Sequence, residues 1–241
     1  DKYFRKEIKP LRKEPENKLI DYLGWHKQNE DYFFVGLPLL SGRLSGKKKS
    51  LIRDLVKEND LDLRLTPNQD ILLCNIPNKN KSEIKKALKK IGYDNLNDIN
   101  EIQRHALACP ALPLCGLAMT EAERILPEVL TRIEILLKDM NIEKTILFRM
   151  TGCPNGCTRP YMAELALVGS GQNKYQLWLG GSKNLQRLAK PYLQRMELDD
   201  LEKTIQPLLE FWKKSSPEKD FGDFINNQKE SLITNLLSEI N

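Results

Sequence analysis

Five cysteines are the side chains of this sequence with the clearest capacity for chemistry. Four of them form two pairs: five residues separate Cys109 from Cys115, three separate Cys153 from Cys157, and 37 lie between the pairs. The second pair brackets Pro-Asn-Gly and the first brackets Pro-Ala-Leu-Pro-Leu. Such residues favour tight turns, so each loop can aim two thiolates in one direction. Four thiolates from two loops are the usual ligand set of a [4Fe–4S] cluster.

Three other interpretations of these cysteines stay open at this point. Structural zinc sites favour Cys-x2-Cys to Cys-x4-Cys spacing, which the first pair exceeds. Disulfides need an oxidising compartment, but no secretory segment is visible and a fifth cysteine would be left over. Unreactive buried cysteines are common one at a time, yet four in loops that contain proline or glycine match core packing poorly. The cluster is the favoured hypothesis.

The fifth cysteine and the two histidines show no such pattern. Cys74 lies in the apolar run Ile-Leu-Leu-Cys-Asn-Ile at 71–76, which predicts a buried packing role and not a ligand. His26 and His105 have neither a serine-centred motif nor metal-ligand spacing. For His105, just before the first cysteine loop, acid–base use is the alternative to capping or packing.

The spacing of hydrophobic residues predicts the helices and strands in the first part of the chain. Hydrophobic residues alternate or recur at helical spacing, and Gly, Pro and Asn interrupt them. A β-α-β-β-α order results, which is about half of a ferredoxin-like sandwich. The Asp/Asn-rich stretch 94–100 predicts a domain boundary. The predicted elements are strand material between 21 and 44, a helix at 47–58, strands at 61–65 and 70–76 joined by a turn, and a helix at 80–91.

A long helix is predicted between the two cysteine pairs. Thr120 and Glu123 form a capping box, and apolar residues then recur with helical spacing as far as Met140. Pro127 falls inside this pattern and predicts a kink or a restart. The helix would act as a scaffold for both loops. The remaining predictions are strands at 145–150, 164–168 and 175–179 and a largely helical segment at 199–240.

Composition narrows the class of protein. Of the 241 residues, 40% are hydrophobic, the mean hydropathy is -0.50, and no apolar run approaches the roughly 18 residues of a membrane span. We therefore expect neither a membrane protein nor, without clustered base-reading residues, a nucleic-acid partner. The net charge of +5 could attract an acidic protein or an anionic substrate, or reflect a solvated lysine surface.

The N-terminus predicts a connector and not the start of a fold. The sequence begins at Asp1, and residues 2–18 are rich in Lys and Glu. A targeting peptide cannot be sought in such a beginning. We expect a cytoplasmic protein, with the plastid stroma as the alternative.

Two stretches carry a resemblance to a known family. They are Thr-Gly-Cys-Pro-Asn-Gly-Cys-Thr-Arg-Pro-Tyr-Met-Ala-Glu at 151–164 and Ala-Cys-Pro-Ala-Leu-Pro-Leu-Cys-Gly-Leu-Ala at 108–118. Both closely resemble ferredoxin-dependent assimilatory sulfite reductase, of the siroheme/[4Fe–4S] sulfite/nitrite reductase family. The resemblance also covers the helix between the loops and Phe-Gly-Asp-Phe at 221–224. It implies an α+β chain: a connector at 1–18, a ferredoxin-like half-domain at 19–98, and an α/β domain at 99–241 that binds siroheme and a [4Fe–4S] cluster.

The resemblance also implies roles for single residues. Cys109, Cys115, Cys153 and Cys157 would bind the cluster, and Cys157 would also ligate the siroheme iron. Asn155 would contact the macrocycle and orient the catalytic loop, and Ala108 would line the cofactor.

The turn at 64–69 is the other part of the implied cofactor site. Arg64, Thr66 and Gln69 surround it with a guanidinium, a hydroxyl and an amide. From the residues alone an ordinary surface turn is equally acceptable. An arginine fork matches carboxylates, however, and siroheme carries carboxylates. The family has an Arg-x-Thr-x-x-Gln pattern at such turns, so the resemblance assigns all three residues to cofactor binding.

The activity implied is the six-electron reduction of sulfite to sulfide with reduced ferredoxin as donor. Gly156, Arg159 and Pro160 favour this enzyme over its nearest rival, ferredoxin-dependent nitrite reductase. A non-catalytic module that holds zinc or a cluster is the alternative from another class. The family is built from two related halves, whereas the Arg-x-Thr-x-x-Gln turn and the β-α-β-β-α unit occur once here. We therefore expect the N-terminal half of the enzyme as a partner, and no turnover by this chain alone.

Overall fold

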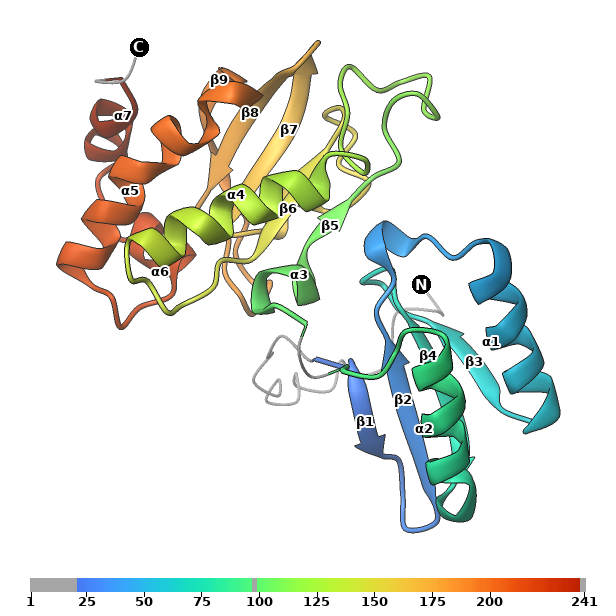
Figure 1. Ribbon diagram of the computed structural model, residues 1–241. Coiled ribbons are helices and arrows are strands. Elements are labelled where there is room, and N and C mark those ends of the chain that lie inside the picture. The colour runs from blue at the N-terminus through green and yellow to red at the C-terminus, as the bar shows by residue number, and fades with distance from the viewer. Residues whose placement is uncertain (1–20, 97–98, 239–241) are drawn as a thin grey trace, which may run out of the picture.

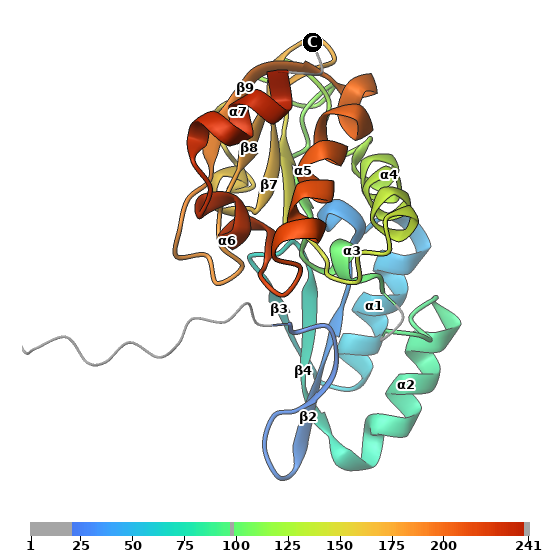
Figure 2. The ribbon, with the colours of Figure 1, turned by 90° about the vertical axis from the view of Figure 1, so that its left-hand side faces the viewer.

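The computed structural model describes residues 21–96 and 99–238, and it contains two β-sheets, each with helices packed on one face (Figures 1 and 2). We refer to residues 21–96 as the N-terminal unit and to residues 99–238 as the C-terminal unit. Each unit has its own main cluster of buried apolar side chains. The connector predicted at 1–18 lies outside the described residues. No helix within the described ranges is long and apolar enough to cross a membrane.

The sheet of the N-terminal unit has four antiparallel strands in the order β1-β2-β4-β3. Helices α1 and α2 cover one of its faces (Figure 2). Apolar side chains on one side of each helix, among them Ile52 and Ile84, pack onto Val35 and Leu73 of the sheet. The elements are β1 (Gly24–Lys27), β2 (Tyr32–Leu37), α1 (Gly46–Glu58), β3 (Asp62–Leu65), β4 (Ile71–Pro77) and α2 (Lys81–Lys90), with short 3₁₀ turns at Leu40–Gly42 and Asn78–Asn80.

Most predicted elements of this unit are confirmed, with one addition. The helices and the strands β3 and β4 lie within a residue or two of the predicted ranges. Strand β1 is not singled out by the sequence pattern, and it pairs with β2 as a hairpin. The Asn29 side chain shapes that hairpin by accepting hydrogen bonds from the backbone N–H groups of Asp31 and Tyr32, at 3.0 and 2.9 Å. The order is therefore β-β-α-β-β-α.

Strand β3 forms an open edge of this sheet. It pairs with β4 on one side, and every one of its residues is exposed. Leu65 is 80% exposed and Leu63 is 43% exposed. An exposed edge with apolar side chains is a common place for another strand to add.

The sheet of the C-terminal unit is mixed and has the order β5-β6-β7-β8-β9. Strands β5, β6 and β7 are parallel, and β8 and β9 continue the sheet antiparallel. Apolar residues of α4, α5, α6 and α7 pack on one face of it. The elements are α3 (Glu101–His105), β5 (Leu107–Ala108), α4 (Leu126–Asp139), β6 (Phe148–Thr151), β7 (Leu165–Gly171), β8 (Lys174–Leu179), β9 (Lys190–Glu197), α5 (Leu201–Ser215), α6 (Phe221–Asn226) and α7 (Glu230–Ser238), with 3₁₀ turns at Pro160–Met162 and Leu198–Asp200.

The predicted start of the long helix is wrong. Helix α4 begins at Leu126, and Pro127 lies in its first turn, where a missing N–H costs nothing because that group has no partner within the helix. Pro127 therefore neither kinks nor restarts the helix. The capping-box side chains are used elsewhere: the Thr120 hydroxyl donates to the Tyr175 hydroxyl at 3.1 Å, and Glu123 forms an ion pair with Arg43 of the N-terminal unit.

Candidate functional site

The two cysteine loops follow neighbouring parallel strands. Cys109 comes directly after β5, and Cys153 comes two residues after β6. The two strands pair in register, with Ala108 opposite Met150. Parallel strands end at the same edge of a sheet, so both loops lie at one edge. In Figure 1 the segment between β5 and α4 forms an extended loop beyond this edge.

Gly152 is the point at which the two loops meet. Its N–H donates to the Cys109 Sγ atom at 3.2 Å, and its carbonyl accepts from the N–H groups of Met119 and Thr120 at 2.8 and 3.3 Å. A Cβ atom here would lie 2.7 Å from both the Ala111 Cβ and the Thr120 carbonyl oxygen. No side chain fits at that distance, so glycine permits the close approach of the first cysteine loop to the second.

The second loop is held in shape by its own hydrogen bonds. The Thr151 hydroxyl donates to the Cys153 carbonyl at 2.8 Å, and the Tyr161 hydroxyl donates to the Pro154 carbonyl at 2.6 Å. Gly156 has a φ of 68°, a conformation that glycine adopts without steric cost. The loop is thus a preformed turn that presents Cys157 at the surface.

The four thiols differ in their exposure to solvent. Cys109 and Cys153 are buried, Cys115 is half-buried and Cys157 is exposed, and none forms a disulfide. Burial raises the pKa of the Cys109 thiol, and charges on Cys157 and Cys153 raise its pKa further. Cys109 is therefore close enough to Cys153 and Cys157 for negative charge on them to repel negative charge on Cys109. A bound cationic centre would remove that repulsion and hold them as thiolates.

A zinc ion and a cluster make different demands on the spacing of their ligands. In the described part of the chain, no three His, Cys, Asp or Glu side chains converge as ligands of one metal ion. A zinc ion with bonds of about 2.3 Å needs its ligands within about 3.8 Å of each other. A four-iron cluster accepts more widely spaced thiolates, because each iron takes its own cysteine.

The structure brings two predicted cofactor-binding residues together. Gln69 Nε2 donates to the Ala108 carbonyl at 3.0 Å, directly before Cys109. The buried Gln69 Oε1 atom has no hydrogen-bond partner among the described residues. The Thr66 hydroxyl, in the same turn, accepts from the N–H groups of Asn68 and Asp70 at 3.3 and 3.1 Å. A ligand with a hydrogen-bond donor would satisfy the free oxygen of Gln69.

The other predicted residues lie apart from this contact. Arg64 is largely exposed on the edge strand β3 and pairs with Asp62 at 3.7 Å. Asn155 is exposed at the tip of the second cysteine loop. Cys74 is buried in β4 of the N-terminal unit, and this burial raises the pKa of its thiol.

Two arginines that the sequence reasoning did not place in the cofactor site lie close to it. Arg159 Nη2 donates to the Pro67 carbonyl at 2.6 Å and so ties the second cysteine loop to the turn at 66–69. Arg149, on β6, is fully buried and donates through Nη1 to the Arg159 carbonyl at 3.1 Å. The signal available for Arg149 was a charged residue between Phe148 and Met150, both apolar, in a buried strand.

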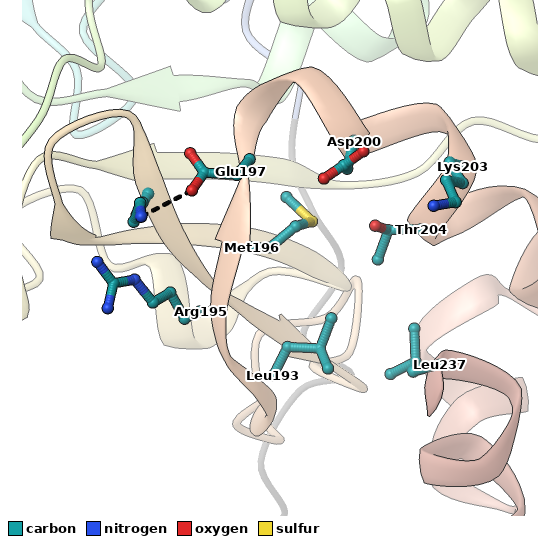
Figure 3. Close-up of a pocket in the computed structure, with 9 residues that line it drawn as sticks. Leu193, Arg195, Met196, Glu197, Asp200, Lys203, Thr204 and Leu237 are labelled. Carbon is teal, nitrogen blue, oxygen red and sulfur yellow. Dashed lines mark ion pairs between the residues drawn. The ribbon is translucent and has the colours of Figure 1, made fainter. Parts of the chain in front are cut away.

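A cavity elsewhere carries none of the predicted site residues. It has a volume of about 380 Å³ and lies between β9 and the helices α5 and α7 (Figure 3). Lys174 and Glu197 form an ion pair of 2.8 Å at its rim. The candidate site is therefore at the cysteine loops and not in this cavity.

Comparisons with known proteins point to the same family. Residues 26–91 match the nitrite/sulfite reductase ferredoxin-like half domain. The chain is 46% identical over 227 residues to "Sulfite reductase [ferredoxin]" of Synechococcus elongatus, covering 92% of this chain and 36% of that protein. It is 36% identical over 211 residues to "Sulfite reductase [NADPH] hemoprotein beta-component" of Oceanobacillus iheyensis, covering 85% of this chain and 36% of that one.

Solved structures show the same fold. The Mycobacterium tuberculosis NirA protein superposes with a TM-score of 0.72 at 22% identity, over 89% of this chain and 41% of that one. Dissimilatory sulfite reductase I superposes with a TM-score of 0.60 at 10% identity, over 86% of this chain and 69% of that one. The chain thus belongs to the sulfite/nitrite reductase family and spans about a third of the length of its sulfite reductase relatives, 36% in both sequences compared.

Proposed function

We propose that this chain is the C-terminal part of a ferredoxin-dependent sulfite reductase that reduces sulfite to sulfide. Six electrons are needed, and siroheme with a [4Fe–4S] cluster would supply the electron-transfer chemistry that side chains cannot. The observation that supports this most is the contact of the two cysteine loops at Gly152. The proposal draws its substrate and donor from the relative that is 46% identical.

We propose that residues of both units hold the two cofactors. Cys109, Cys115, Cys153 and Cys157 would hold the cluster, with Cys157 shared by the siroheme iron. The exposure of Cys157 suits this sharing, because a thiolate at the surface can meet a second group. The Gly152 N–H, directed at the Cys109 sulfur, would stabilise negative charge on that ligand. Thr66, Gln69, Ala108, Asn155 and Arg64 are the proposed contacts of the macrocycle.

Four cations that would be candidates for binding an anion are each engaged with a protein group in the part of the chain that the structure describes. Arg43 pairs with Glu123, and Lys183 pairs with Asp220 at 3.3 Å. Arg64 pairs with Asp62, and Arg159 binds the Pro67 carbonyl. Sulfite carries charge that basic groups must neutralise. We propose that those groups come from the N-terminal half of the enzyme, which would be the main partner of this chain.

The electron donor and the substrate are open to direct test. Relatives named for ferredoxin and for NADPH both match, and the higher identity of 46% favours ferredoxin. Nitrite is the alternative substrate, since the matching half-domain is common to nitrite and sulfite reductases. Parallel assays of the complete enzyme with sulfite and nitrite, each with reduced ferredoxin, decide this. Faster turnover of nitrite would overturn the substrate assignment. We expect the enzyme in the cytoplasm, with the plastid stroma as the alternative.

Replacement of Cys157 by serine tests the cofactor assignment. In the complete enzyme, Cys157→Ser should uncouple siroheme from the cluster and abolish sulfide formation. The visible and EPR spectra report the coupling, and iron analysis reports cluster content. Cys74→Ser is the matched control, with the same atom exchange outside the loops, and should keep both cofactors. A Cys157→Ser enzyme with coupled cofactors and full activity would contradict the bridging role.

The dependence on a partner is tested by expressing residues 1–241 alone with both cofactors supplied. We expect no sulfide from sulfite with a chemical reductant. Turnover at the rate of a complete sulfite reductase, from a monodisperse monomer, would contradict the proposal. Arg43, Arg64, Arg159 and Lys183 would then be the first residues to examine for anion binding.

A further inference from the structure

Arg149 is a buried cation that has no counter-charge among the residues that the structure describes. Its side chain is 0% exposed, and its Nε and Nη2 atoms have no hydrogen-bond partner among the described residues. The charge that acts on it there is that of Arg159, a second cation. Burial, with a smaller contribution from Arg159, lowers the pKa of Arg149 to about 10, so it stays protonated at neutral pH. An unpaired buried charge is costly to the fold, and such groups call for a functional explanation.

The position of Arg149 points to the cysteine loop. The residue lies on β6, four positions before Cys153. Its Nη1 atom donates to the carbonyl of Arg159, two positions after Cys157, and the N–H of Arg159 donates to the Gly156 carbonyl at 2.8 Å. The guanidinium therefore lies beneath the loop, bonded to the backbone just beyond the exposed cysteine.

We propose that Arg149 is a fixed counter-charge for the iron–sulfur cluster, which raises the reduction potential of that cluster without touching it. The inference rests on the proposed function, because it requires the four cysteines to bind a cluster. Four thiolates bring negative charge to the loops, and each electron that arrives adds to it. A positive charge held in a region of low dielectric stabilises the reduced form more than the oxidised form.

The size of the effect follows from the geometry. Arg149 Nη1 lies 3.1 Å from the Arg159 carbonyl oxygen, and Arg159 is two residues after Cys157, so bond lengths keep the guanidinium within roughly 15 Å of the cysteine sulfur. At an effective dielectric constant of about 20, one unit charge at about 12 Å, which is inside that limit, changes an equilibrium about tenfold. For a one-electron couple, a tenfold change is about 59 mV. Complete burial matters here, because an exposed arginine at the same distance would be screened by water and salt.

The test is a potentiometric titration of the complete, cofactor-loaded enzyme followed by EPR. Arg149→Met removes the charge and keeps the approximate length of the side chain. We expect its cluster potential to fall, with an equilibrium shifted about tenfold toward the oxidised form. Arg149→Lys keeps the charge and should restore most of the shift. Arg195→Met makes the same change in net charge at an exposed side chain of β9, three strands away from β6, and should leave the potential unchanged.

A second measurement separates this role from a merely structural one. In cofactor-free protein, Arg149→Met should unfold at a temperature no lower than the wild type, because it removes an unpaired buried charge. If the equilibrium constant for cluster reduction in Arg149→Met lay within twofold of the wild-type value, the inference would be overturned. An Arg149→Lys variant with the same potential as Arg149→Met would overturn it too. A wild-type enzyme without a cluster would instead contradict the proposed function, so the two failures are distinguishable.

Discussion

The two units of the chain bury different kinds of side chain. In the N-terminal unit the described buried side chains are apolar ones, such as Val35 and Leu73, and they pack under α1 and α2. In the C-terminal unit apolar burial is joined by seven buried polar or charged side chains. These are Thr120, Arg149, Thr151, Thr158, Glu164, Ser182 and Thr204.

This difference separates scaffold from site. Apolar burial is not directional and stabilises a fold without fixing single atoms. Buried polar groups are tolerated only where hydrogen bonds satisfy them or where function requires them, and they fix the positions of their partners. Three of the seven, Thr151, Thr158 and Arg149, bond to the second cysteine loop or to the strand that leads to it. We therefore expect large effects from apolar truncation in the first unit and from small steric or polar changes in the second.

The largest expected effect comes from the core of the N-terminal unit. Leu73 is fully buried, so Leu73→Ala should lower the free energy of unfolding of that unit by about 3 kcal/mol. Denaturant titration measures the loss, and iron analysis should show an unchanged cluster. Leu63→Ala, on exposed β3, is the control and should stay within about 0.5 kcal/mol of the wild type. Loss of cluster iron in Leu73→Ala would show that the two units form one cooperative system.

Gly152→Ala should show the reverse pattern to Leu73→Ala: it should lose less stability but much more cluster iron. The added methyl group would lie 2.7 Å from Ala111 Cβ and from the Thr120 carbonyl, which pushes the cysteine loops apart. We expect a destabilisation of about 2 kcal/mol and less than half of the wild-type cluster iron. Gly116→Ala, in the first loop but with open space around it, is the matched control. Equal iron in both variants would refute close packing at Gly152.

Glu164 tests the role of buried polar groups in the C-terminal unit, because its titration should make stability depend on pH. Burial raises its pKa from 4.5 to about 7, and its carboxylate accepts from the N–H groups of Leu147 and Gly222, both at 2.8 Å. Because the folded state holds the proton more tightly than the unfolded state, stability should fall as pH rises from about 4.5 to about 7. Glu164→Gln, which turns an N–H₂ group toward one of those donors, should cost about 1–2 kcal/mol.

Thermal unfolding at pH 5 and pH 8 measures both parts of this prediction. The unfolding temperature of the wild type should exceed that of Glu164→Gln by more at pH 5 than at pH 8, because Glu164 is neutral in the folded protein at pH 5. A difference that grows toward pH 8 would mean that the carboxylate is stabilised in its charged form.

The smallest effect is expected at Cys74. Cys74→Ala should leave iron content unchanged and lower stability by at most about 1–2 kcal/mol, as a modest core truncation. Cys109→Ala, an identical exchange in the first cysteine loop, should lose cluster iron. Iron loss from the Cys74 variant would contradict its assignment to packing.

The sequence predicted those parts of the fold whose local pattern and tertiary role agree. Helices α1 and α2 are amphipathic, and their periodicity placed them within a residue or two. Strand β5 has only two residues, and β9, with its mixed polar composition and Pro191, lacks a clean alternation. Neither strand could be found by a pattern. The prediction of a capping box failed because Glu123 forms an ion pair with Arg43, a residue far away in the sequence.

The candidate site shows the same limit. The cysteines could be found from spacing, because both loops carry their own turn residues. The contact of Gln69 with Ala108 and the burial of Arg149 depend on how the two units and their strands assemble, which local spacing does not encode. The roles assigned to Arg64, Asn155 and the four cysteines stay predictions, as does the boundary at 94–100.

The pairing of β5 with β6 has a consequence for recognising distant relatives. Hydrogen-bonded strands lie about 4.8 Å apart whatever the length of chain that joins them, so the sheet sets the distance between the two cysteine loops. The 37 residues between the cysteine pairs include α4 and could lengthen or shorten without moving a ligand. A search pattern that fixes this gap would therefore reject any relative in which its length differs. One that holds each cysteine motif rigid and leaves the gap free follows the geometry of the sheet.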